Sequence, residues 1–479
     1  MITHLVWLRN DLRISDNTAL NAACKNPNAK VIAVFIATPE QWLRHNMSPR
    51  QATFIYETIL QLQKSLAKKG ISFIYHQCAD FDDSVKWLNN YCYKQQVTKL
   101  FYNRQYEINE RQRDQKLEQC LKNKIICSGF DDNVILPPGS VLKDTGQMYK
   151  IYTPFRKAFI QHLIASDIQS LPIPTIRHNG SDVITKIPPH FNYPHQAVDK
   201  IFPAGENNAL QLLKEFCREK APYYDEKRNI PAINGTSRLS PYLAIGALSP
   251  RQCFNKLLAE FPDILIKPYS GGAFSWLNEL IWREFYRHLI VAYPFLCMGK
   301  PFITWTEKIR WNHNRQYFNA WKQGLTGFPI VDAAMRQLNT IGWMHNRLRM
   351  ISASFLVKDL LIDWRIGEQY FMSQLLDGDF ASNNGGWQWA ASTGNDSVPY
   401  FRIFNPTTQG KRFDPNGTFI RQWIPELTNV PDKHIHNPHN WTDKDQNAIN
   451  YPSPIVDHDQ ARKKAIMEYS NAKNESTIS

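Results

Sequence analysis

The hydrophobic pattern changes along the chain, and this change constrains the fold more than any other feature of the sequence. Within the first 130 residues, short β-branched or aromatic runs alternate with longer polar-patterned segments. The runs predict strands at His4–Leu8, Val31–Ala37, Ile71–His76 and Thr98–Asn103, with helices between them. Ser48 followed by Pro49 predicts a helix start, and Gly70 predicts the end of that helix. Residues 1–130 are therefore predicted to form an α/β domain with a parallel, Rossmann-like sheet.

The rest of the chain lacks this alternation. Residues 131–203 are rich in Pro, Asn, His and Ser, a composition that predicts an interdomain connection made of loops. From Ala204 onward the pattern is helical, with predicted N-caps at Ser240 and Ser249. The prediction is an all-helical second domain over 204–479 with a frayed tail after Asp457, and 479 residues are enough for two domains.

Composition narrows the class of partner. The chain has 56 Lys and Arg against 43 Asp and Glu, and this +13 charge favours nucleic acid over a membrane surface, although charge alone also suits a merely soluble protein. The eight cysteines include no C-x-x-C pair, so we expect no zinc site, no disulfides and reduced thiols in the cytoplasm. No apolar run reaches the roughly 20 residues needed to span a bilayer, so we expect no membrane contact. We also predict a monomer.

Of two turns that precede helices, only one is a candidate for phosphate binding. The first strand is followed by Arg9-Asn10-Asp11-Leu12-Arg13, which has no glycine, so the dinucleotide fingerprint is absent there. The segment Gly235-Thr236-Ser237-Arg238-Leu239-Ser240-Pro241 places hydroxyls and a guanidinium before a helix, where a pyrophosphate could bind. Taken alone, the second segment is better explained as an ordinary capped helix with solvated polar residues.

Two helical segments carry residues suited to an unpaired base. In Trp276–Arg287, a carboxylate, two aromatic rings and two guanidiniums fall on neighbouring turns at Glu279, Trp282, Arg283, Tyr286 and Arg287. In Gly342–Met350, Asn346 and Met350 lie one turn apart on one face. A core aromatic beside surface ion pairs is the alternative for the first segment. His345 has no His or Cys at ligand spacing, so no metal site is assigned.

The segment Asp377–Trp389 combines carboxylates, small residues and tryptophans, and we predict that it is too irregular for a plain amphipathic helix. Its Trp387, together with Trp311 and Trp364, could relay electrons if the three lie close together. Core packing is the alternative for each of them.

Taken together and in this order, these segments resemble the class I cyclobutane pyrimidine dimer photolyases of the photolyase and cryptochrome family. The likeness includes Trp7-Leu8-Arg9-Asn10-Asp11-Leu12-Arg13, Thr236–Ser240, Trp276–Arg287, Trp343–Met350 and Gly385–Thr393, and it runs across nearly the whole chain. The resemblance implies an enzyme whose reduced flavin, once excited by light, donates an electron to the dimer in DNA and recovers it after the ring opens.

The resemblance also implies roles for individual residues. FAD would contact Tyr224, Thr236, Ser237, Arg238, Leu239, Ser240, Trp276, Arg283, Asp377, Gly378, Asp379 and Asn383. DNA would contact Arg228, Glu279, Trp282, Arg283, Arg287, Asn346, Arg347, Met350 and Arg402. Catalysis would depend on Glu279, Asn346 and Asn383, and photoreduction on Trp387, Trp364 and Trp311, ordered from flavin to surface.

An antenna chromophore is implied for the first domain. His45, Asn109 and Glu110 resemble the residues that bind 5,10-methenyltetrahydrofolate in folate-type members. One position departs from that pattern, because Met298 follows Cys297 where these members tend to carry lysine, and Lys300 comes two residues later.

Four alternatives can be weighed on the same residues. A (6-4) photolyase would carry two histidines where this chain has Asn346 and Met350. A cryptochrome would commonly have a long C-terminal extension and lack an asparagine at Asn383. A flavoprotein oxidoreductase or a nucleic-acid-binding module would explain the charge but not the combination of Trp282, Asn346 and Met350.

Overall fold

The computed structural model describes residues 2–177, 188–441 and 449–477, which form two compact units. Unit 1 comprises the chain up to Pro222 with Ser237–Cys297 and Leu376–Ala381, and unit 2 comprises Tyr223–Thr236, Met298–Leu375 and the chain from Ser382 onward. The three predicted domains, 1–130, 131–203 and 204–479, divide the chain at other points and stay a prediction.

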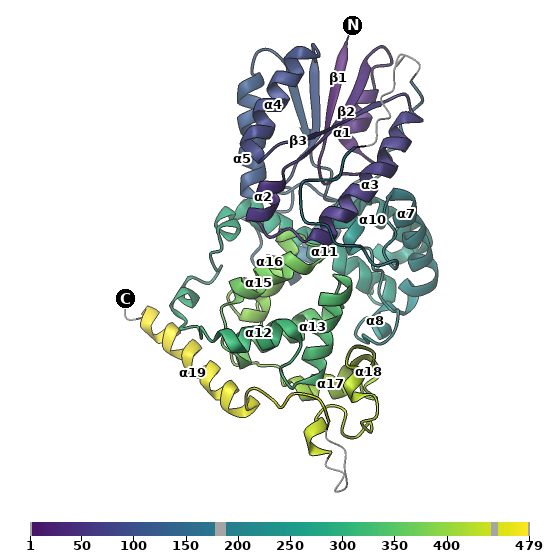
Figure 1. Ribbon diagram of the computed structural model, residues 1–479. Coiled ribbons are helices and arrows are strands. Elements are labelled where there is room, and N and C mark those ends of the chain that lie inside the picture. The colour runs from purple at the N-terminus through teal and green to yellow at the C-terminus, as the bar shows by residue number, and fades with distance from the viewer. Residues whose placement is uncertain (1, 178–187, 442–448, 478–479) are drawn as a thin grey trace. The chain divides into compact units, whose positions relative to one another are not determined.

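Unit 1 contains a five-stranded parallel sheet in the order β3-β2-β1-β4-β5 (Figure 1). Its strands are β1 Thr3–Leu8, β2 Lys30–Ala37, β3 Ser72–Gln77, β4 Lys99–Asn103 and β5 Ile126–Phe130. The predicted parallel α/β architecture and four of these strands are confirmed. The sequence analysis missed β5, an edge strand, because its Ser128 and Gly129 interrupt the apolar run that marks the other strands.

Helices cover both faces of this sheet. Apolar side chains of α4 Phe81–Lys94 and α5 Ile108–Leu121 pack with Trp7, Val34 and Leu100 on one face, while α1 Thr18–Cys24 and α3 Pro49–Ala67 lie against the strands on the other (Figure 1). The predicted start of α3 is confirmed, because the Ser48 side chain accepts from the Arg50 backbone and Pro49 is the first helical residue.

The remaining helices of unit 1 are α2 Pro39–Arg44, α6 Tyr152–Ala165, α7 Glu206–Glu215, α9 Ser240–Ala244, α10 Pro250–Glu260 and α11 Gly272–Ala292. The cap at Ser249 is confirmed by a capping box with Gln252. The cap at Ser240 is wrong, because Ser240 is already the first residue of α9. The loop prediction for 131–203 is wrong over α6, whose apolar residues recur at helical spacing and are buried even though prolines surround the helix.

The described residues of unit 2 form helices and connecting loops, with no strand among them. Its helices are α8 Tyr224–Lys227, α12 Arg315–Gln323, α13 Pro329–Ile341, α14 Asn346–Ser354, α15 Trp364–Gln374, α17 Pro406–Phe413, α18 Thr418–Trp423 and α19 His458–Thr477, together with most of α16 Phe380–Ala391. Two predictions are wrong here. Asp377–Trp389 is regular helix from Phe380 onward, and the expected frayed tail is α19, which buries Ala465, Tyr469 and Ala472.

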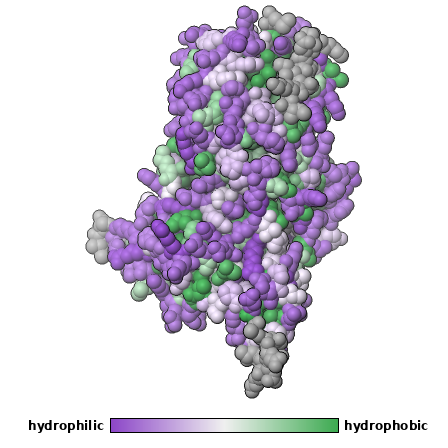
Figure 2. All heavy atoms as spheres, viewed as in Figure 1, coloured by the Kyte–Doolittle hydropathy of each residue, from purple (hydrophilic) through white to green (hydrophobic). Residues whose placement is uncertain are grey.

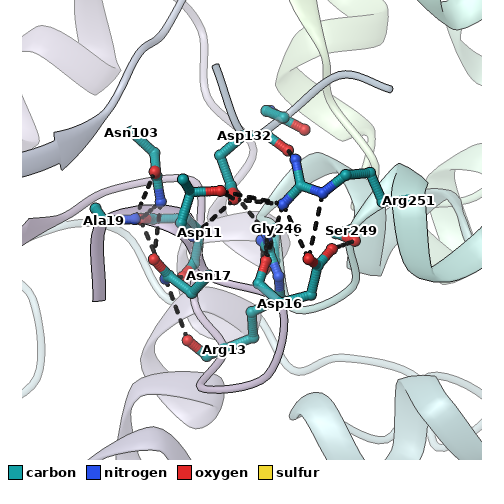
Figure 3. A network of polar contacts seen from close by, with 12 residues as sticks. Asp11, Arg13, Asp16, Asn17, Ala19, Asn103, Asp132, Gly246, Ser249 and Arg251 are labelled. Atoms are coloured by element: carbon teal, nitrogen blue, oxygen red, sulfur yellow. Dashed lines mark hydrogen bonds and ion pairs between the residues drawn. The ribbon is translucent and has the colours of Figure 1, made fainter. Parts of the chain in front are cut away.

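A buried polar network connects the turn after β1 with α10 in unit 1 (Figure 3). We call it the Asp132 network, and its side chains belong to Asp11, Arg13, Asp16, Asn17, Asn103, Asp132, Ser249 and Arg251. The fully buried Asp132 carboxylate forms ion pairs with Arg13 and, at 2.7 Å, with Arg251. These two guanidiniums lower the pKa of Asp132 to about 2 despite its burial. The turn that lacks a glycine fingerprint is therefore fixed by charges within the protein.

The surface agrees with the composition. Most residues visible in Figure 2 are hydrophilic, with hydrophobic residues interspersed among them. Within the described ranges, no helix is both long enough and apolar enough to cross a bilayer. The eight cysteines all fall in these ranges, and each carries a free thiol.

Candidate active site

Helix α11 presents different residues on two neighbouring faces. Glu279, Trp282 and Tyr286 recur at helical spacing and are half-buried. Arg283 and Arg287 lie next to this row on the buried side of the helix. The sequence analysis placed all five on one face and missed this division between an accessible row and a buried cationic pair.

A tyrosine supports the indole ring of Trp282. The rings of Tyr152 and Trp282 are stacked at 3.6 Å between centroids and 9° between planes, and the Tyr152 hydroxyl donates to the Asn278 carbonyl oxygen at 3.0 Å. One face of the indole is therefore occupied by protein. The sequence analysis missed Tyr152 because it treated α6 as loop, although Phe155 and Phe159 follow Tyr152 at helical spacing.

The buried arginines of α11 lie among carboxylates. Arg287 Nη1 is 3.1 Å from Asp379 Oδ2, and these side chains are 5% and 14% exposed. Arg283 Nη1 donates to the Asn133 carbonyl oxygen at 2.9 Å and lies 3.6 Å from Glu284 Oε1. We call Glu107, Glu110, Arg283, Glu284, Arg287 and Asp379 the Arg287 cluster.

The buried charges of the Arg287 cluster are poorly compensated by their neighbours. Burial and repulsion by Arg287 lower the pKa of Arg283 to about 10. Burial raises the pKa of Glu284 to about 7, although Arg283 and the backbone N–H groups of Ile135 and Leu136 oppose that shift. Strongly shifted groups of this kind gather at functional sites.

The other predicted FAD residues of unit 1 lie in three places. Ser237, Arg238, Leu239 and Ser240 form the turn into α9, where Arg238 has a φ of +53°, a left-handed conformation that is sparsely populated for residues other than glycine. Trp276 is buried on α11 beside Phe216, with ring centroids 4.8 Å apart. Before α16, Asp377 is buried and the Gly378 carbonyl oxygen accepts from Gln51 Nε2 at 2.7 Å.

The predicted antenna residues meet at the start of α5. Asn109 Nδ2 lies 3.2 Å from His45 Nε2. Glu110 follows directly, and burial raises the pKa of its carboxyl group. The neighbouring Glu107, which precedes α5, has its pKa raised to about 7 by burial and by the charges of Glu110 and Asp379. The sequence analysis missed Glu107, which becomes noticeable only once α5 and α11 are placed in three dimensions.

In unit 2, α14 carries the predicted amide and thioether. Asn346 is exposed at the first helical position, and Met350 is half-buried one turn later. His345 caps the helix by accepting from the Arg347 backbone N–H at 3.2 Å. In the part of the chain that the structure describes, no cluster of three or more His, Cys, Asp or Glu residues could hold a metal ion.

The predicted arginines of unit 2 differ in their surroundings. Arg347 donates through Nη2 to Asn229 Oδ1 at 2.8 Å and stacks over the Phe413 ring. Arg228 lies over the ring of the buried Tyr224. Arg402 is exposed, and Thr236, from the predicted phosphate segment, is half-buried.

Asn383 is oriented by the neighbouring helix. Its Nδ2 donates to the Glu368 backbone oxygen of α15 at 3.0 Å. Because this contact engages the NH₂ end of the amide, it directs Oδ1 to the other side, where it can accept a hydrogen bond.

The three predicted relay tryptophans belong to one hydrophobic cluster of unit 2. Trp364 and Trp387 are buried in it, and the half-buried Trp311 packs against it. Trp387 lies so close to Gly367, one turn after Trp364 on α15, that a Cβ at Gly367 would be 2.2 Å from the indole. At the other side, Trp311 meets the Tyr469 ring of α19 edge-on, with centroids 6.1 Å apart.

Known proteins resemble the chain over its whole length. Residues 4–175 match the family described as DNA photolyase, and residues 276–471 match the FAD binding domain of DNA photolyase. Deoxyribodipyrimidine photo-lyases of Salmonella typhimurium and Escherichia coli are each 55% identical to the chain over 99% of both sequences. The chain belongs to the DNA photolyase family.

Solved structures agree with this family membership. A class III photolyase from Agrobacterium tumefaciens has a TM-score of 0.85 and 32% identity, covering 99% of this chain and 98% of its own. A cryptochrome from Synechocystis has a TM-score of 0.86 and 28% identity, covering 98% and 99%. The predicted fold class is confirmed. The fold itself is shared by photolyases and cryptochromes.

The residues present fit the FAD that the family binds. In unit 1, the carboxylates of the buried Asp377 and of Asp379 can accept from ribose hydroxyls or ring N–H groups. FAD is therefore the cofactor of this family member.

Proposed function

We propose that the chain is a deoxyribodipyrimidine photo-lyase, which uses light and bound FAD to split cyclobutane pyrimidine dimers in DNA. The 55% identity to two enzymes of that name, sustained over the full chain, carries this proposal. It also fits the basic charge of +13, since DNA is a polyanion.

Three residues separate this function from its neighbours in the family. Asn346 and Met350 occupy α14 where a (6-4) photolyase would present two histidines. Asn383 is an asparagine, which a cryptochrome would lack at this position. The fold cannot make this distinction, because the Synechocystis cryptochrome shares it.

Each proposed contact with the dimer has a physical role. When bound, reduced FAD supplies the electron that opens the dimer ring and receives it back. The NH₂ group of Asn346 and the O–H of a protonated Glu279 carboxyl group donate to the pyrimidine carbonyl oxygens, where negative charge develops. Trp282, backed by Tyr152, stacks on a base extruded from the duplex.

The proposed contacts to DNA phosphates are arginines that are exposed or half-buried. Arg402 is exposed, and Arg228 and Arg347 are half-buried, so we assign DNA phosphates to these three. Arg283 and Arg287 were predicted to contact DNA as well. Their burial among protein partners favours a role inside the protein.

We assign flavin photoreduction to Trp387, Trp364 and Trp311, which share one hydrophobic cluster. Trp311→Phe is expected to abolish light-driven reduction of oxidised FAD by an external donor. Repair by chemically reduced enzyme is expected to persist, because the relay does not contact the dimer. Steady-state photoreduction measures the first effect, and undiminished reduction would mean that electrons take another route.

The antenna assignment is part of the proposal. His45, Asn109 and Glu110 are the proposed contacts of methenyltetrahydrofolate, supported by the 3.2 Å approach of His45 and Asn109. An archaeal photolyase from Sulfolobus tokodaii, with a TM-score of 0.82 and 30% identity over 98% of this chain, was solved with two FAD molecules, so a flavin is the alternative antenna. A cytoplasmic, monomeric enzyme completes the proposal.

The experiment that tests the cofactor is an absorption spectrum of the purified protein. The expected result is a flavin spectrum with about one FAD per chain. Colourless protein that cannot be reconstituted with FAD would contradict the proposed function.

A further inference from the structure

Helix α5 starts alongside the C-terminal part of α11. Arg111 Nη1 donates to the Val291 carbonyl oxygen at 3.5 Å, one turn beyond Arg287. Burial raises the pKa of the Cys297 thiol, just after α11, and the Ile108 backbone N–H at the first position of α5 opposes that shift. These contacts bring the proposed antenna residues, which follow Ile108, close to the buried face of α11.

Arg287 is the common partner of carboxylates from the two proposed cofactor sites. It pairs at 3.1 Å with Asp379, a proposed FAD residue. Its charge also acts on Glu107, which lies two residues before Asn109 and three before Glu110 and also feels the charge of Asp379. The Glu107 Oε2 atom accepts from the Tyr106 backbone N–H at 3.1 Å, which keeps that carboxylate at the start of α5.

We propose that Arg287 is a positioning residue shared by the FAD site and the antenna site, so that each bound cofactor strengthens the binding of the other. This inference rests on the proposed function for the identity of the two cofactors. Arg287 itself contacts Asp379 and is only 5% exposed, which removes it from the surface that meets DNA.

FAD binding and antenna binding are coupled because each would order the same side chain, the Arg287 guanidinium. FAD contacts that immobilise Asp379 also fix Arg287, and antenna contacts that immobilise the Glu107–Glu110 turn restrict the same side chain through its interaction with the Glu107 charge. The second cofactor then binds a site that is already ordered, so the gain is reciprocal.

The test measures FAD release from the holoenzyme, followed by the rise of free flavin fluorescence after dilution, with and without saturating methenyltetrahydrofolate. Folate is expected to slow FAD release about fivefold or more in the native protein. In Glu107→Gln, which leaves the Arg287–Asp379 pair intact, this ratio is expected to fall toward one. Arg287→Lys keeps the charge but loses the planar fork, so it is also expected to reduce the ratio.

Glu118→Gln is the matched control, because Glu118 lies on the same helix and pairs with the Tyr102 hydroxyl, away from Arg287. Glu118→Gln should keep the native ratio of FAD release rates without and with folate. If Glu107 had a merely structural role, Glu107→Gln would change the FAD release rate itself and leave this ratio unchanged. A ratio of one in the native protein, an unchanged ratio in Glu107→Gln, or a native holoenzyme that takes up no folate would each overturn the inference. All three outcomes leave FAD binding and dimer repair standing, whereas absence of FAD would contradict the proposed function itself.

Discussion

Unit 1 holds two buried clusters of arginines and carboxylates that differ in how well their charges are satisfied. In the Asp132 network, Asp132 has two guanidinium partners and accepts from both the backbone N–H and the hydroxyl of Thr18, and its pKa falls to about 2. In the Arg287 cluster, burial outweighs compensation and raises the pKa of Glu107 and of Glu284 to about 7. The carboxylate of Asp132 is therefore well compensated within the protein, whereas the buried carboxylates of the Arg287 cluster are not.

This difference separates stability from function. Changes in the Asp132 network should lower stability and leave the chemistry of the folded protein intact. Changes along α11 should alter ligand binding or the response to pH, with smaller costs to folding.

The largest expected effect is on folding. Asp132→Asn removes the charge that compensates Arg13 and Arg251, and leaving buried charges uncompensated typically costs about 3–5 kcal/mol. Urea denaturation followed by circular dichroism measures the loss, and FAD content per folded protein should stay native. Asp83→Asn, which breaks an exposed pair with Lys86, is the control and should change stability far less, because solvent screens that pair. If both variants lost the same free energy of unfolding, the Asp132 network would have no special role in stability, and the distinction between it and the Arg287 cluster would fail.

The second effect is a pH dependence specific to the Arg287 cluster. The pKa of Glu284 is raised from 4.5 to about 7, so its contribution to stability is present below 4.5 and is lost as pH rises through about 7. Glu284→Gln stays neutral, and between pH 4.5 and 7.5 it should therefore lose about 2–3 kcal/mol less stability than the native protein does. Asp132 acts in the opposite direction, because its contribution disappears only as pH falls from 3.8 through about 2. Parallel pH profiles for the native protein and Glu284→Gln would show that Glu284 is ionised throughout.

The third effect is on damaged DNA. Trp282→Ala removes a stacking platform worth roughly 1–3 kcal/mol, so dimer-containing DNA should bind about ten- to a hundredfold more weakly. Undamaged duplex, held by phosphate contacts, should change little at fixed salt. Tyr286→Ala, on the same row of α11, is the comparison variant. An equal loss on both DNAs would make Trp282 a structural residue.

The sequence predicted what depends on local pattern. Strands of the parallel sheet, the helix at Trp276–Arg287 and the one-turn spacing of Asn346 and Met350 all follow from periodicity. Composition misled at α6, where prolines on both sides concealed an amphipathic helix, and at α16, where glycines and asparagines suggested irregular chain.

The rest of the site could not be predicted because it depends on distant contacts. Tyr152 and Trp282 are 130 positions apart, and Arg287 and Asp379 are separated by 92 residues. Whether an arginine of α11 meets DNA or a buried carboxylate is decided by packing, which no local pattern records.

Light-dependent repair tests the central claim most directly. An oligonucleotide with one cyclobutane thymine dimer is incubated with reduced holoenzyme in darkness or under near-ultraviolet or blue light, and the restored thymines are separated chromatographically. We predict repair only in the light. In Glu279→Gln, the repair yield per absorbed photon should fall by a larger factor than the affinity for dimer-containing DNA, because the hydrogen bond from Glu279 matters most once negative charge reaches the dimer. Dimer-specific binding without repair under illumination would contradict the account.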